Sequence, residues 1–412
     1  MKKESTSFLK KRSKKLLTVG AHLAGNVRPK SKSFLLLFFK KEVLSFFCFF
    51  CVAAAPLSPE TSDVAKLAPL AAHWVFVETA PSGFTLVDAD HGKILAAVPM
   101  EFADNLAIAP DRKHIYVAET MWTERTRGVR QDLLTTYDAG TLDILHETKI
   151  PPRALAVFKA QDLALSASGR TAFVFNLAPA TSVTVVDVAS GAVTGHIDTP
   201  GCALVYPWKD GGFSSLCGNG TLLNVALAAH AAPVVTHTKP FFAAATDPVF
   251  EASLVDPATA QAVFISFTGK VIPVVLGPQP QIGATWSLQE AAGQKAAGTG
   301  VQELAWRPGG YQVASWHKAS GRLFVLMHPG TFWTQKEPGT EVWVFSMATK
   351  KLIRRIPLKV PAKGIAVSQD AAPLLYAASG HGDLAVIKAD TGEELRSVSL
   401  AGRGPLLIAP GL

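Results

Sequence analysis

Short apolar runs separated by polar turns recur along the chain from about residue 73 onward. In each copy an apolar run ends in a turn, a second run follows directly, and a third run passes into another tight turn. Apolar residues after that turn begin a fourth run. Runs of the first kind are NLAIAPDRK (105–113), LALSASGRT (163–171) and GIAVSQDAA (364–372), and the tight turns begin at Asp88, Asp138, Asp187, Ser346 and Lys388. This pattern predicts units of four short β-strands.

The spacing of the turns gives the number of units. The long interval between Asp187 and Ser346 has room for two degraded copies, TLLNVALAAHAAPVV (221–235) and GKVIPVVLGPQPQI (269–282). Seven units of about 40–55 residues with four strands each are typical of a β-propeller. A β-sandwich does not repeat at this length, and a solenoid needs capping units. We therefore predict an all-β, seven-bladed β-propeller.

The two ends of this repeat region complement each other. The first unit begins at HWVFVETA (73–80), which matches a second strand, and the chain ends on PLLIAPGL (405–412), which matches a first strand. We predict that the C-terminal strand pairs into the first blade and closes the ring, because closure leaves no unpaired edge where the ends meet.

Charge separates an N-terminal region from the rest. The formal charge is +8, but residues 1–42 hold twelve Lys or Arg against Glu4 and Glu42, so the remainder is slightly acidic. A nearly neutral folded part argues against nucleic acid as a partner. The apolar stretch VLSFFCFFCVAAA (43–55) fits a secretory signal cleaved near Ala54 or Ala55.

An uncleaved anchor is the alternative, although a membrane-spanning helix needs about 20 apolar residues. The predicted organisation is a basic extension and signal peptide at 1–55, a short arm at 56–72 and the propeller at 73–412.

Removal of the signal leaves two cysteines, Cys202 and Cys217, which flank a turn at 209–212. Residues equidistant from the turn of an antiparallel hairpin face each other, so the two sulfurs can meet across the strands. An even number of cysteines in an exported chain favours a disulfide. Two buried free thiols are the alternative.

A search for catalytic motifs finds no metal-binding helix, nucleophile elbow or phosphate-binding loop. The histidines, among them His73, His317, His328 and His381, show no ligand spacing. The aspartates at the repeated turns are expected to cap the turn backbone. The sequence thus predicts no catalytic residue and no metal site in this chain.

Two stretches fall outside the repeat: residues 287–346, whose first part has helix formers broken by glycines, and the charged residues 119–138, interpreted as a long connection. Long loops on a propeller face are where partners bind. Aromatic residues beside charges suit a subunit interface, although a tryptophan at a blade edge is equally typical of packing. The candidate interface residues are Trp306, Tyr311, Trp333, Lys336 and Glu337.

Several stretches resemble the heavy subunit of the quinoprotein amine dehydrogenases, the methylamine and aromatic amine dehydrogenase family. They are WRPGGYQVASWHKASGRLFVLMH (306–328), FWTQKEPGTEVWVF (332–345), SQDAAPLLYAAS (368–379), DTGEELRSV (390–398) and the hairpin between the two cysteines. The likeness runs from about residue 73 to residue 409.

The resemblance implies a periplasmic α2β2 enzyme that converts primary amines to aldehyde and ammonia. It implies tryptophan tryptophylquinone on a separate small subunit, no cofactor in this chain, and electron transfer to a cupredoxin, amicyanin or azurin. The phenylalanine that borders the family's substrate channel aligns with Phe102 in EFADN (101–105). Ordinary packing between blades is the alternative role for Phe102. The competing functions are a stand-alone lactonase-like hydrolase and a non-catalytic binding propeller.

Overall fold

The computed structural model describes residues 66–78, 83–100, 102, 105–155, 159–228, 231–400, 404 and 406–411. These residues belong to one compact unit. The extension and signal peptide predicted for 1–55, and the arm up to residue 65, lie outside the described residues.

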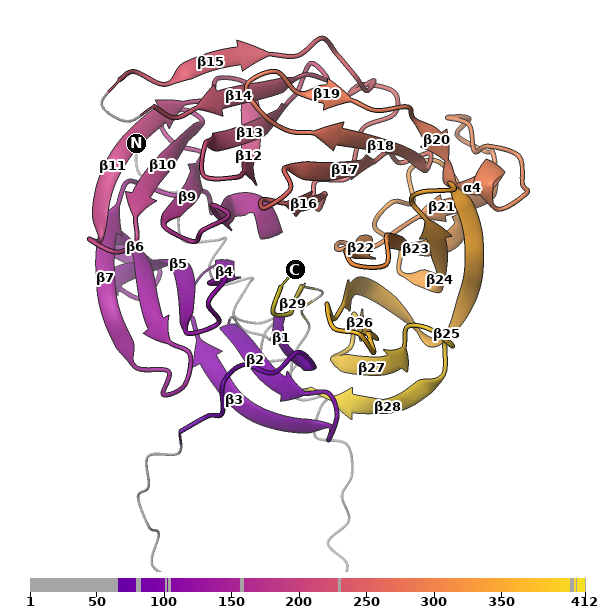
Figure 1. Ribbon diagram of the computed structural model, residues 1–412, viewed down its shortest axis with the longest axis horizontal. Helices are drawn as coiled ribbons and strands as arrows, with labels where there is room; N and C mark the ends of the chain where they lie inside the picture. Colours follow the sequence, from indigo (N-terminus) through magenta and orange to yellow (C-terminus); the bar gives the residue numbers. More distant parts are fainter. Residues whose placement is uncertain are drawn as a thin grey trace, which may run out of the picture. The chain divides into compact units, whose positions relative to one another are not determined.

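The described chain is an all-β propeller, in which twisted sheets are arranged around a common centre (Figure 1). In each four-stranded sheet the antiparallel strands are ordered from an inner strand near the centre to an outer strand at the rim. Helix is confined, within the described residues, to the 3-10 turn η3 (Ala160–Asp162) and the short helix α4 (Leu288–Ala291).

Four of the sheets hold four strands each, and three of these form the N-terminal part of the propeller. The first is ordered β29 (Leu407–Ile408), β1 (Trp74–Glu78), β2 (Gly83–Asp88) and β3 (Lys93–Pro99). The second holds β4 (Asn105–Ile108), β5 (His114–Glu124), β6 (Arg127–Asp138) and β7 (Ile144–Ile150). The third holds β8 (Leu163–Leu165), β9 (Thr171–Asn176), β10 (Ser182–Asp187) and β11 (Ala192–Asp198).

The remaining sheets follow around the ring (Figure 1). One holds β12 (Cys202–Trp208), β13 (Gly212–Cys217), β14 (Leu222–Ala226) and β15 (Val234–His237). The next holds β16 (Leu254–Asp256), β17 (Gln261–Ile265), β18 (Lys270–Val275), β19 (Gln281–Ile282) and β20 (Trp286–Ser287). An eight-stranded sheet holds β21 (Ala305–Pro308), β22 (Ala314–His317), β23 (Arg322–Gly330), β24 (Gly339–Ser346), β25 (Lys351–Val367), β26 (Leu374–Ser379), β27 (Asp383–Lys388) and β28 (Glu394–Ser399).

The middle strands are buried on both faces, because each sheet packs against a neighbour on either side. In β2 and β10 five of six residues are buried, whereas the outer strands β3 and β7 expose most of theirs. Hydrophobic clusters fill the spaces between sheets; one joins Phe84 and Leu86 of β2 to Ile115 and Val117 of β5. Burial on both faces explains why the sequences of these middle strands are continuous apolar runs.

The recurring aspartates cap their turns, as predicted. Asp138 Oδ1 accepts hydrogen bonds from the backbone N–H groups of Gly140 (2.8 Å) and Thr141 (2.9 Å). Asp187 Oδ1 accepts from the N–H (2.8 Å) and the hydroxyl (2.6 Å) of Ser190. These bonds hold the pKa of both carboxyls below the ordinary value. The repeated aspartates are therefore parts of the fold.

The last strand of the chain pairs with the first. In β29, Leu407 and Ile408 lie opposite Val77 and Phe76 of β1 in antiparallel register. The carbonyl of Leu406 also accepts a hydrogen bond from the backbone N–H of Glu78 (3.0 Å). Residues from the two ends of the propeller thus share one sheet.

The interpretation of residues 119–138 as a connection was wrong. They are most of a long hairpin, in which β5 and β6 stay paired from His114 with Asp138 out to Glu124 with Arg127. The residues nearest the turn are largely exposed on both strands. Polar side chains are therefore tolerated there without breaking the ladder.

Residues 287–346 divide into two parts. Ser287 caps α4 by accepting a hydrogen bond from the backbone N–H of Glu290 (3.3 Å), and an irregular segment follows up to residue 304. From residue 305 onward the stretch consists of strands β21 to β24 and their turns. The insertion is therefore limited to about residues 288–304.

Candidate channel loop and subunit interface

Phe102 lies in the connection between β3 and β4, and its side chain is partly exposed. Its backbone carbonyl accepts a hydrogen bond from Nη2 of Arg153 at 2.5 Å. Met100 is buried in the hydrophobic cluster between the first two sheets, and Asn105 is fixed by a hydrogen bond from its Nδ2 to the carbonyl of Lys159 (2.6 Å). The connection is thus anchored before, at and after Phe102.

Arg153, which follows β7, belongs to a buried polar network based on the long hairpin. Asp132 of β6 accepts hydrogen bonds from Thr120 Oγ1 (2.6 Å) and from Nε and Nη2 of Arg130 (both 2.7 Å). Nη2 of Arg130 also donates to the carbonyl of Arg153 (2.7 Å). Asp132 is only 4% exposed and Arg153 only 2% exposed. A two-pronged, charge-assisted pair of this kind fixes geometry as well as neutralising the buried charge.

Two further buried carboxyls lie near this network. The Thr135 hydroxyl donates to Glu119, and burial raises the pKa of Glu119. Asp162 at the end of η3 has a pKa raised to about 7 because it is buried, although Lys159 and Arg153 favour its ionised form. Buried polar and charged side chains thus lie close to Arg153, which contacts Phe102.

The structure divides the five candidate interface residues into two kinds. Trp306 of β21 is partly buried and packs on Trp343, with ring centroids 5.4 Å apart. Tyr311 is 45% exposed and Trp333 is 57% exposed. Lys336 and Glu337 are also exposed. Trp306 thus packs partly within the propeller, whereas the other four side chains face solvent; all five stay candidates for an interface.

The exposed candidates are brought together by backbone contacts. The N–H of Gly310 donates to the carbonyl of Gln335 (3.0 Å), which joins the loop after β23 to the segment after β21. Lys363 Nζ lies 5.7 Å from the centre of the Tyr311 ring. Trp333 stacks edge-on against the buried Phe332. We call the surface formed by Tyr311, Trp333, Lys336 and Glu337 the aromatic loop surface.

Sequence reasoning missed two groups beside this surface. Leu304 is 73% exposed, and Val301 near it is also exposed, although both are apolar. Arg307 is fully buried and donates from Nε to the carbonyl of Gly330 (3.1 Å) and from Nη2 to the carbonyl of Gly298 (2.9 Å). One buried guanidinium thus joins the insertion to the end of β23. The exposed apolar residues could have been suspected from the sequence, because Val301 and Leu304 lie in a segment that is rich in glycine.

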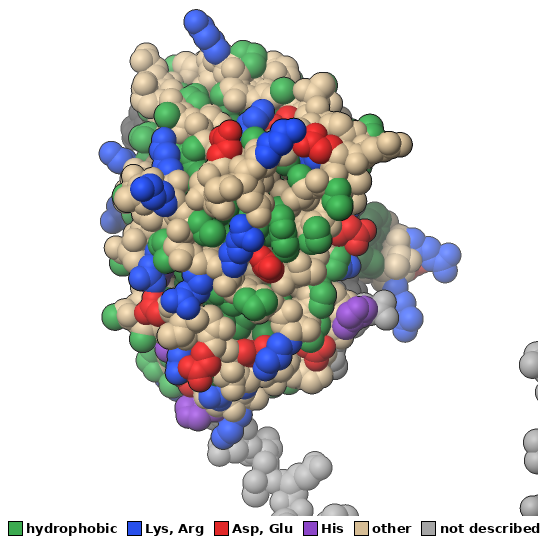
Figure 2. All heavy atoms as spheres, turned by 90° about the vertical axis from the view of Figure 1, so that its right-hand side faces the viewer, with side chains coloured by type: hydrophobic (Ala, Val, Ile, Leu, Met, Phe, Trp, Pro, Cys, Tyr) green, Lys and Arg blue, Asp and Glu red, His purple; other side chains and the backbone are tan. Residues whose placement is uncertain are grey.

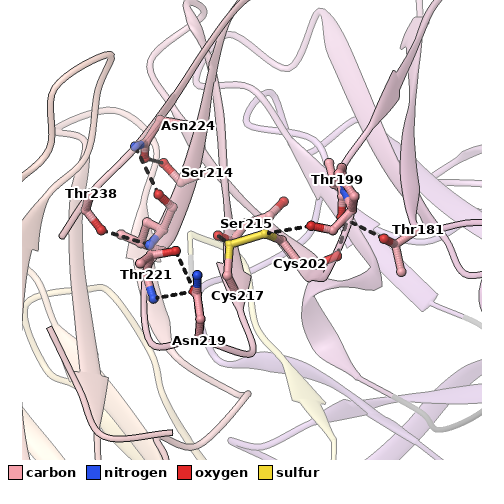
Figure 3. The surroundings of a disulfide bond; sticks show 12 residues. Thr181, Thr199, Cys202, Ser214, Ser215, Cys217, Asn219, Thr221, Asn224 and Thr238 are labelled. Atoms are coloured by element: carbon pink, nitrogen blue, oxygen red, sulfur yellow. Dashed lines mark hydrogen bonds between the residues drawn. A yellow bond between two sulfur atoms is a disulfide. The ribbon is translucent and has the colours of Figure 1, made fainter. Parts of the chain in front are cut away.

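Cys202 of β12 and Cys217 of β13 form a disulfide (Figure 3). The two residues are directly opposite in the hairpin register, as their distance from the turn predicted. Both are buried. Threonine and serine side chains surround the bond and are hydrogen-bonded to neighbouring strands (Figure 3). The alternative of two free thiols is excluded.

Three of the histidines singled out in the sequence, His73, His317 and His328, have hydrogen-bond partners for their rings within the described residues. His73 lies between Asp90 (Nδ1 to Oδ1, 2.8 Å) and Asp370 (Nε2 to Oδ2, 3.2 Å). His317 contacts the Ser320 hydroxyl through Nδ1 (2.7 Å). Within the part of the chain that the structure describes, no cluster of three or more His, Cys, Asp or Glu side chains is arranged to hold a metal ion.

Two adjoining surface hollows, of about 330 and 430 Å³, share Pro240 and Phe241. The buried Asp247 borders one of them, and it accepts hydrogen bonds from the Ser266 hydroxyl (3.0 Å) and from the N–H (3.0 Å) and hydroxyl (2.7 Å) of Thr268. Asp247 therefore joins the segment before β16 to the turn between β17 and β18. On the side of the molecule in Figure 2, hydrophobic side chains are interspersed with Lys, Arg, Asp and Glu.

The family model of the methylamine dehydrogenase heavy chain (MADH) matches residues 71–410, which is almost the whole propeller. The chain belongs to the methylamine dehydrogenase heavy-chain family. The methylamine dehydrogenase heavy chain of Methylorubrum extorquens is 28% identical over 372 residues, which cover 86% of this chain and 88% of that protein. That of Paracoccus versutus is 30% identical over 330 residues, covering 78% of this chain and 74% of that protein.

Solved structures agree on the fold. The crystal structure of a candidate 6-phosphogluconolactonase from Bacteroides uniformis aligns with a TM-score of 0.55 at 12% identity, covering 84% of this chain and 99% of that one. A second, from Bacteroides fragilis, also aligns with a TM-score of 0.55 at 12% identity, covering 85% and 99%. At such low identity the likeness concerns the propeller alone.

Membership in the methylamine dehydrogenase heavy-chain family identifies the chain as the heavy-subunit component of an amine dehydrogenase. A heavy chain implies a smaller partner subunit. Among the described residues no helix is long and apolar enough to cross a membrane.

Proposed function

We propose that this chain is the heavy subunit of an exported, periplasmic α2β2 enzyme that oxidises primary amines to aldehyde and ammonia. The observation that carries the proposal is the family match over residues 71–410. The cofactor, tryptophan tryptophylquinone on the small subunit, supplies the electrophilic carbonyl and takes up the electrons. Those electrons pass to a cupredoxin, amicyanin or azurin. This chain contributes no catalytic group and no cofactor.

The heavy subunit has two tasks in this proposal: it holds the small subunit, and it shapes the path of the amine. The aromatic loop surface is the proposed contact with the small subunit. Exposed Tyr and Trp side chains beside fixed charges are typical of protein interfaces. The exposure of Trp333 and Tyr311 supports this role.

Phe102 is the proposed border of the substrate channel. Its partial exposure, and the anchored connection in which it lies, support a side chain that faces a path and stays in place. Such a ring can exclude water and limit the length of the amine. Precise placement of a reacting molecule lowers the barrier without any covalent role for the residue that places it.

We further propose that the propeller has seven blades and is closed by β29. Support comes from β25, which is 17 residues long and pairs with β24 through its first half and with β26 through its second half. The eight-stranded sheet would then comprise two blades that share this strand. Among the described residues, one hydrophobic cluster joins β28 to β1 and β29 through Val398, Val75 and Leu407.

We propose that the chain is exported to the periplasm. Residues 43–55, with cleavage near Ala54 or Ala55, are the proposed signal peptide; residues 1–55 then leave the mature chain, and residues 56–72 form a short arm before the propeller at 73–412. The disulfide between Cys202 and Cys217 fits an oxidising compartment. We propose no nucleic-acid partner and no stable membrane anchor.

Co-expression with the small subunit and its maturation machinery tests the function. We expect dye-linked amine oxidation from the purified complex and none from this chain alone. Calcium-dependent lactone hydrolysis by the isolated chain would instead support a lactonase-like hydrolase. Purification from amine-grown cells without any quinone-bearing subunit would support a non-catalytic binding propeller.

A further inference from the structure

The hairpin of β5 and β6 is longer than other hairpins of the propeller, and its buried polar residues are not used by the proposed reaction. β5 has 11 residues and β6 has 12, whereas the corresponding strands β9 and β10 have six each. The buried Asp132 and Thr120 lie opposite each other in the hairpin register. A buried charged network is costly unless its geometry is satisfied.

The network is connected to Phe102 through Arg153. Arg130 and Asp132 fix the main chain at Arg153, since Arg130 donates to the Arg153 carbonyl (2.7 Å) and the Arg153 N–H lies 3.4 Å from Asp132 Oδ1. From its side chain, Arg153 Nη2 donates a hydrogen bond to the carbonyl of Phe102 at 2.5 Å. Because the main chain of Arg153 is fixed and its side chain is buried, the planar guanidinium is a rigid hydrogen-bond donor.

Among the described residues, the hydrogen bond from Arg153 is a direct link between Phe102 and the buried interior. Residue 102 lies outside the strands, and its ring is not among the side chains that pack on the hydrophobic clusters of the described residues. The neighbouring Met100 and Asn105 are anchored by burial and by a hydrogen bond to Lys159. The hydrogen bond from Arg153 acts at the one position between them that bears the aromatic ring.

We propose that Arg153 is a positioning residue for the substrate channel: held by the Asp132 network of the β5–β6 hairpin, it fixes the backbone at Phe102 and thereby sets the length of amine that the channel accepts. This rests on the proposed function, in which Phe102 borders the channel. Arg153 touches neither the amine nor the cofactor. The class of ligand concerned is the unbranched primary alkylamine, whose chain length is read by the phenyl ring.

The experiment uses the assembled enzyme, full-length heavy chain with its small subunit, and n-alkylamines from methylamine to butylamine. Arg153→Met removes the donors, and Arg153→Lys keeps the charge and a single donor. Phe102→Ala removes the ring directly. Arg322→Met, at the distant ion pair with Asp390, controls for the loss of a guanidinium.

We expect Arg153→Met to change the ratio of KM for butylamine to KM for methylamine by about tenfold, because the fit of one methylene group in an apolar site is worth about 10-fold or more. The kcat for the best amine should stay within about twofold, since no group at the reacting atoms is altered. Arg153→Lys should restore part of the ratio, and Arg322→Met should leave it unchanged.

A double-mutant cycle decides whether Arg153 acts through Phe102. In the Phe102→Ala background, Arg153→Met should have no further effect on the KM ratio. If the two substitutions change the KM ratio independently, so that their effects multiply in the double variant, the proposal is wrong. It is also wrong if Arg153→Met lowers kcat and kcat/KM equally for every amine. If Arg153→Met does not assemble with the small subunit, Arg153→Lys carries the same cycle with the same criteria.

The experiment distinguishes an error in the channel role of Phe102 from an error in the positioning role of Arg153. If Phe102→Ala leaves the KM series unchanged, the channel role of Phe102 is wrong, and the inference falls with it. If Phe102→Ala shifts the series while both Arg153 variants match the wild type, only the positioning role of Arg153 is wrong.

Discussion

Gln312 and Leu407 exchange two hydrogen bonds although 95 residues separate them in the sequence: Gln312 Nε2 donates to the Leu407 carbonyl (3.0 Å), and the Leu407 N–H donates to Gln312 Oε1 (2.9 Å). The side chain thus occupies the free edge of β29, while β1 pairs with the other edge. A strand of only two residues is held on both sides.

Gln312→Ala should destabilise the propeller by about 1–3 kcal/mol, because two backbone groups of β29 lose their partners. Chemical denaturation of the isolated heavy chain measures this. Gln279→Ala, at an exposed loop position, is the matched control and should leave the midpoint unchanged. Equal stability of the two variants would contradict a supporting role for Gln312.

Removal of the disulfide should weaken the fold without altering its architecture. Cys202→Ala with Cys217→Ala opens a loop whose ends are 15 residues apart, so the chain-entropy model predicts a loss of about 3 kcal/mol. Thermal unfolding of the oxidised wild type and of the double variant compares the two. A reductant should lower the melting temperature of the wild type toward that of the variant and leave the variant unaffected.

Trp333→Ala and Trp306→Ala should separate association from folding. Trp333 is largely exposed, so its truncation should weaken binding of the small subunit by about tenfold or more and leave the melting temperature unchanged. Trp306 packs on Trp343, so its truncation should lower stability by about 3 kcal/mol. The first is read by titration of the small subunit and the second by denaturation. A loss of stability in Trp333→Ala would assign that residue to packing instead.

Asp162 should make the protein less stable as the pH rises. The pKa of its buried carboxyl is about 7 in the folded protein and near 3.8 in an unfolded chain. Below about pH 4 both states are protonated. Between the two values the unfolded chain releases its proton while the folded protein keeps it, so folding stability falls up to about pH 7 and is level above it. Asp162→Asn should make this decline smaller in melting temperatures from pH 4 to pH 8. Glu78, whose pKa burial also raises to about 7, should leave a decline of the same sign in the variant.

Asp187 should make the protein more stable as the pH rises, which is the opposite of the effect of Asp162. Its hydrogen bonds from Ser190 lower the pKa of the carboxyl in the folded protein. Its contribution to stability is therefore full above the unfolded pKa and is lost as the pH falls through the folded pKa. Asp187→Asn should be less stable than the wild type at neutral pH and should converge with it in acid. Parallel curves at all pH values would contradict the turn-capping role.

The sequence was informative where each structural unit depends on neighbouring residues. The turn aspartates, the double burial of inner strands and the hairpin of Cys202 and Cys217 all have local signatures, so the all-β propeller and the disulfide were predicted correctly. The hairpin at 119–138 was not, because its charged residues are satisfied by partners across the ladder, such as Thr120 for Asp132. Charge alone cannot distinguish such a ladder from a loop.

The site was less predictable. Arg153 and Phe102 are 51 residues apart, and the acceptor is a backbone carbonyl, which leaves no trace in residue type. Trp306 and Trp333 look equivalent in the sequence, yet the first packs on Trp343 and the second faces solvent. Burial depends on which strand or loop carries the ring, and only the folded chain decides that.

The pairing of β29 with β1 has a consequence for biosynthesis. Glu78 at the end of β1 and Leu406 just before β29 are 328 residues apart in the sequence. The edge of β1 therefore stays without this partner until nearly all of the described propeller has been synthesised. A chain truncated before Leu407 would lack the strand that covers this edge.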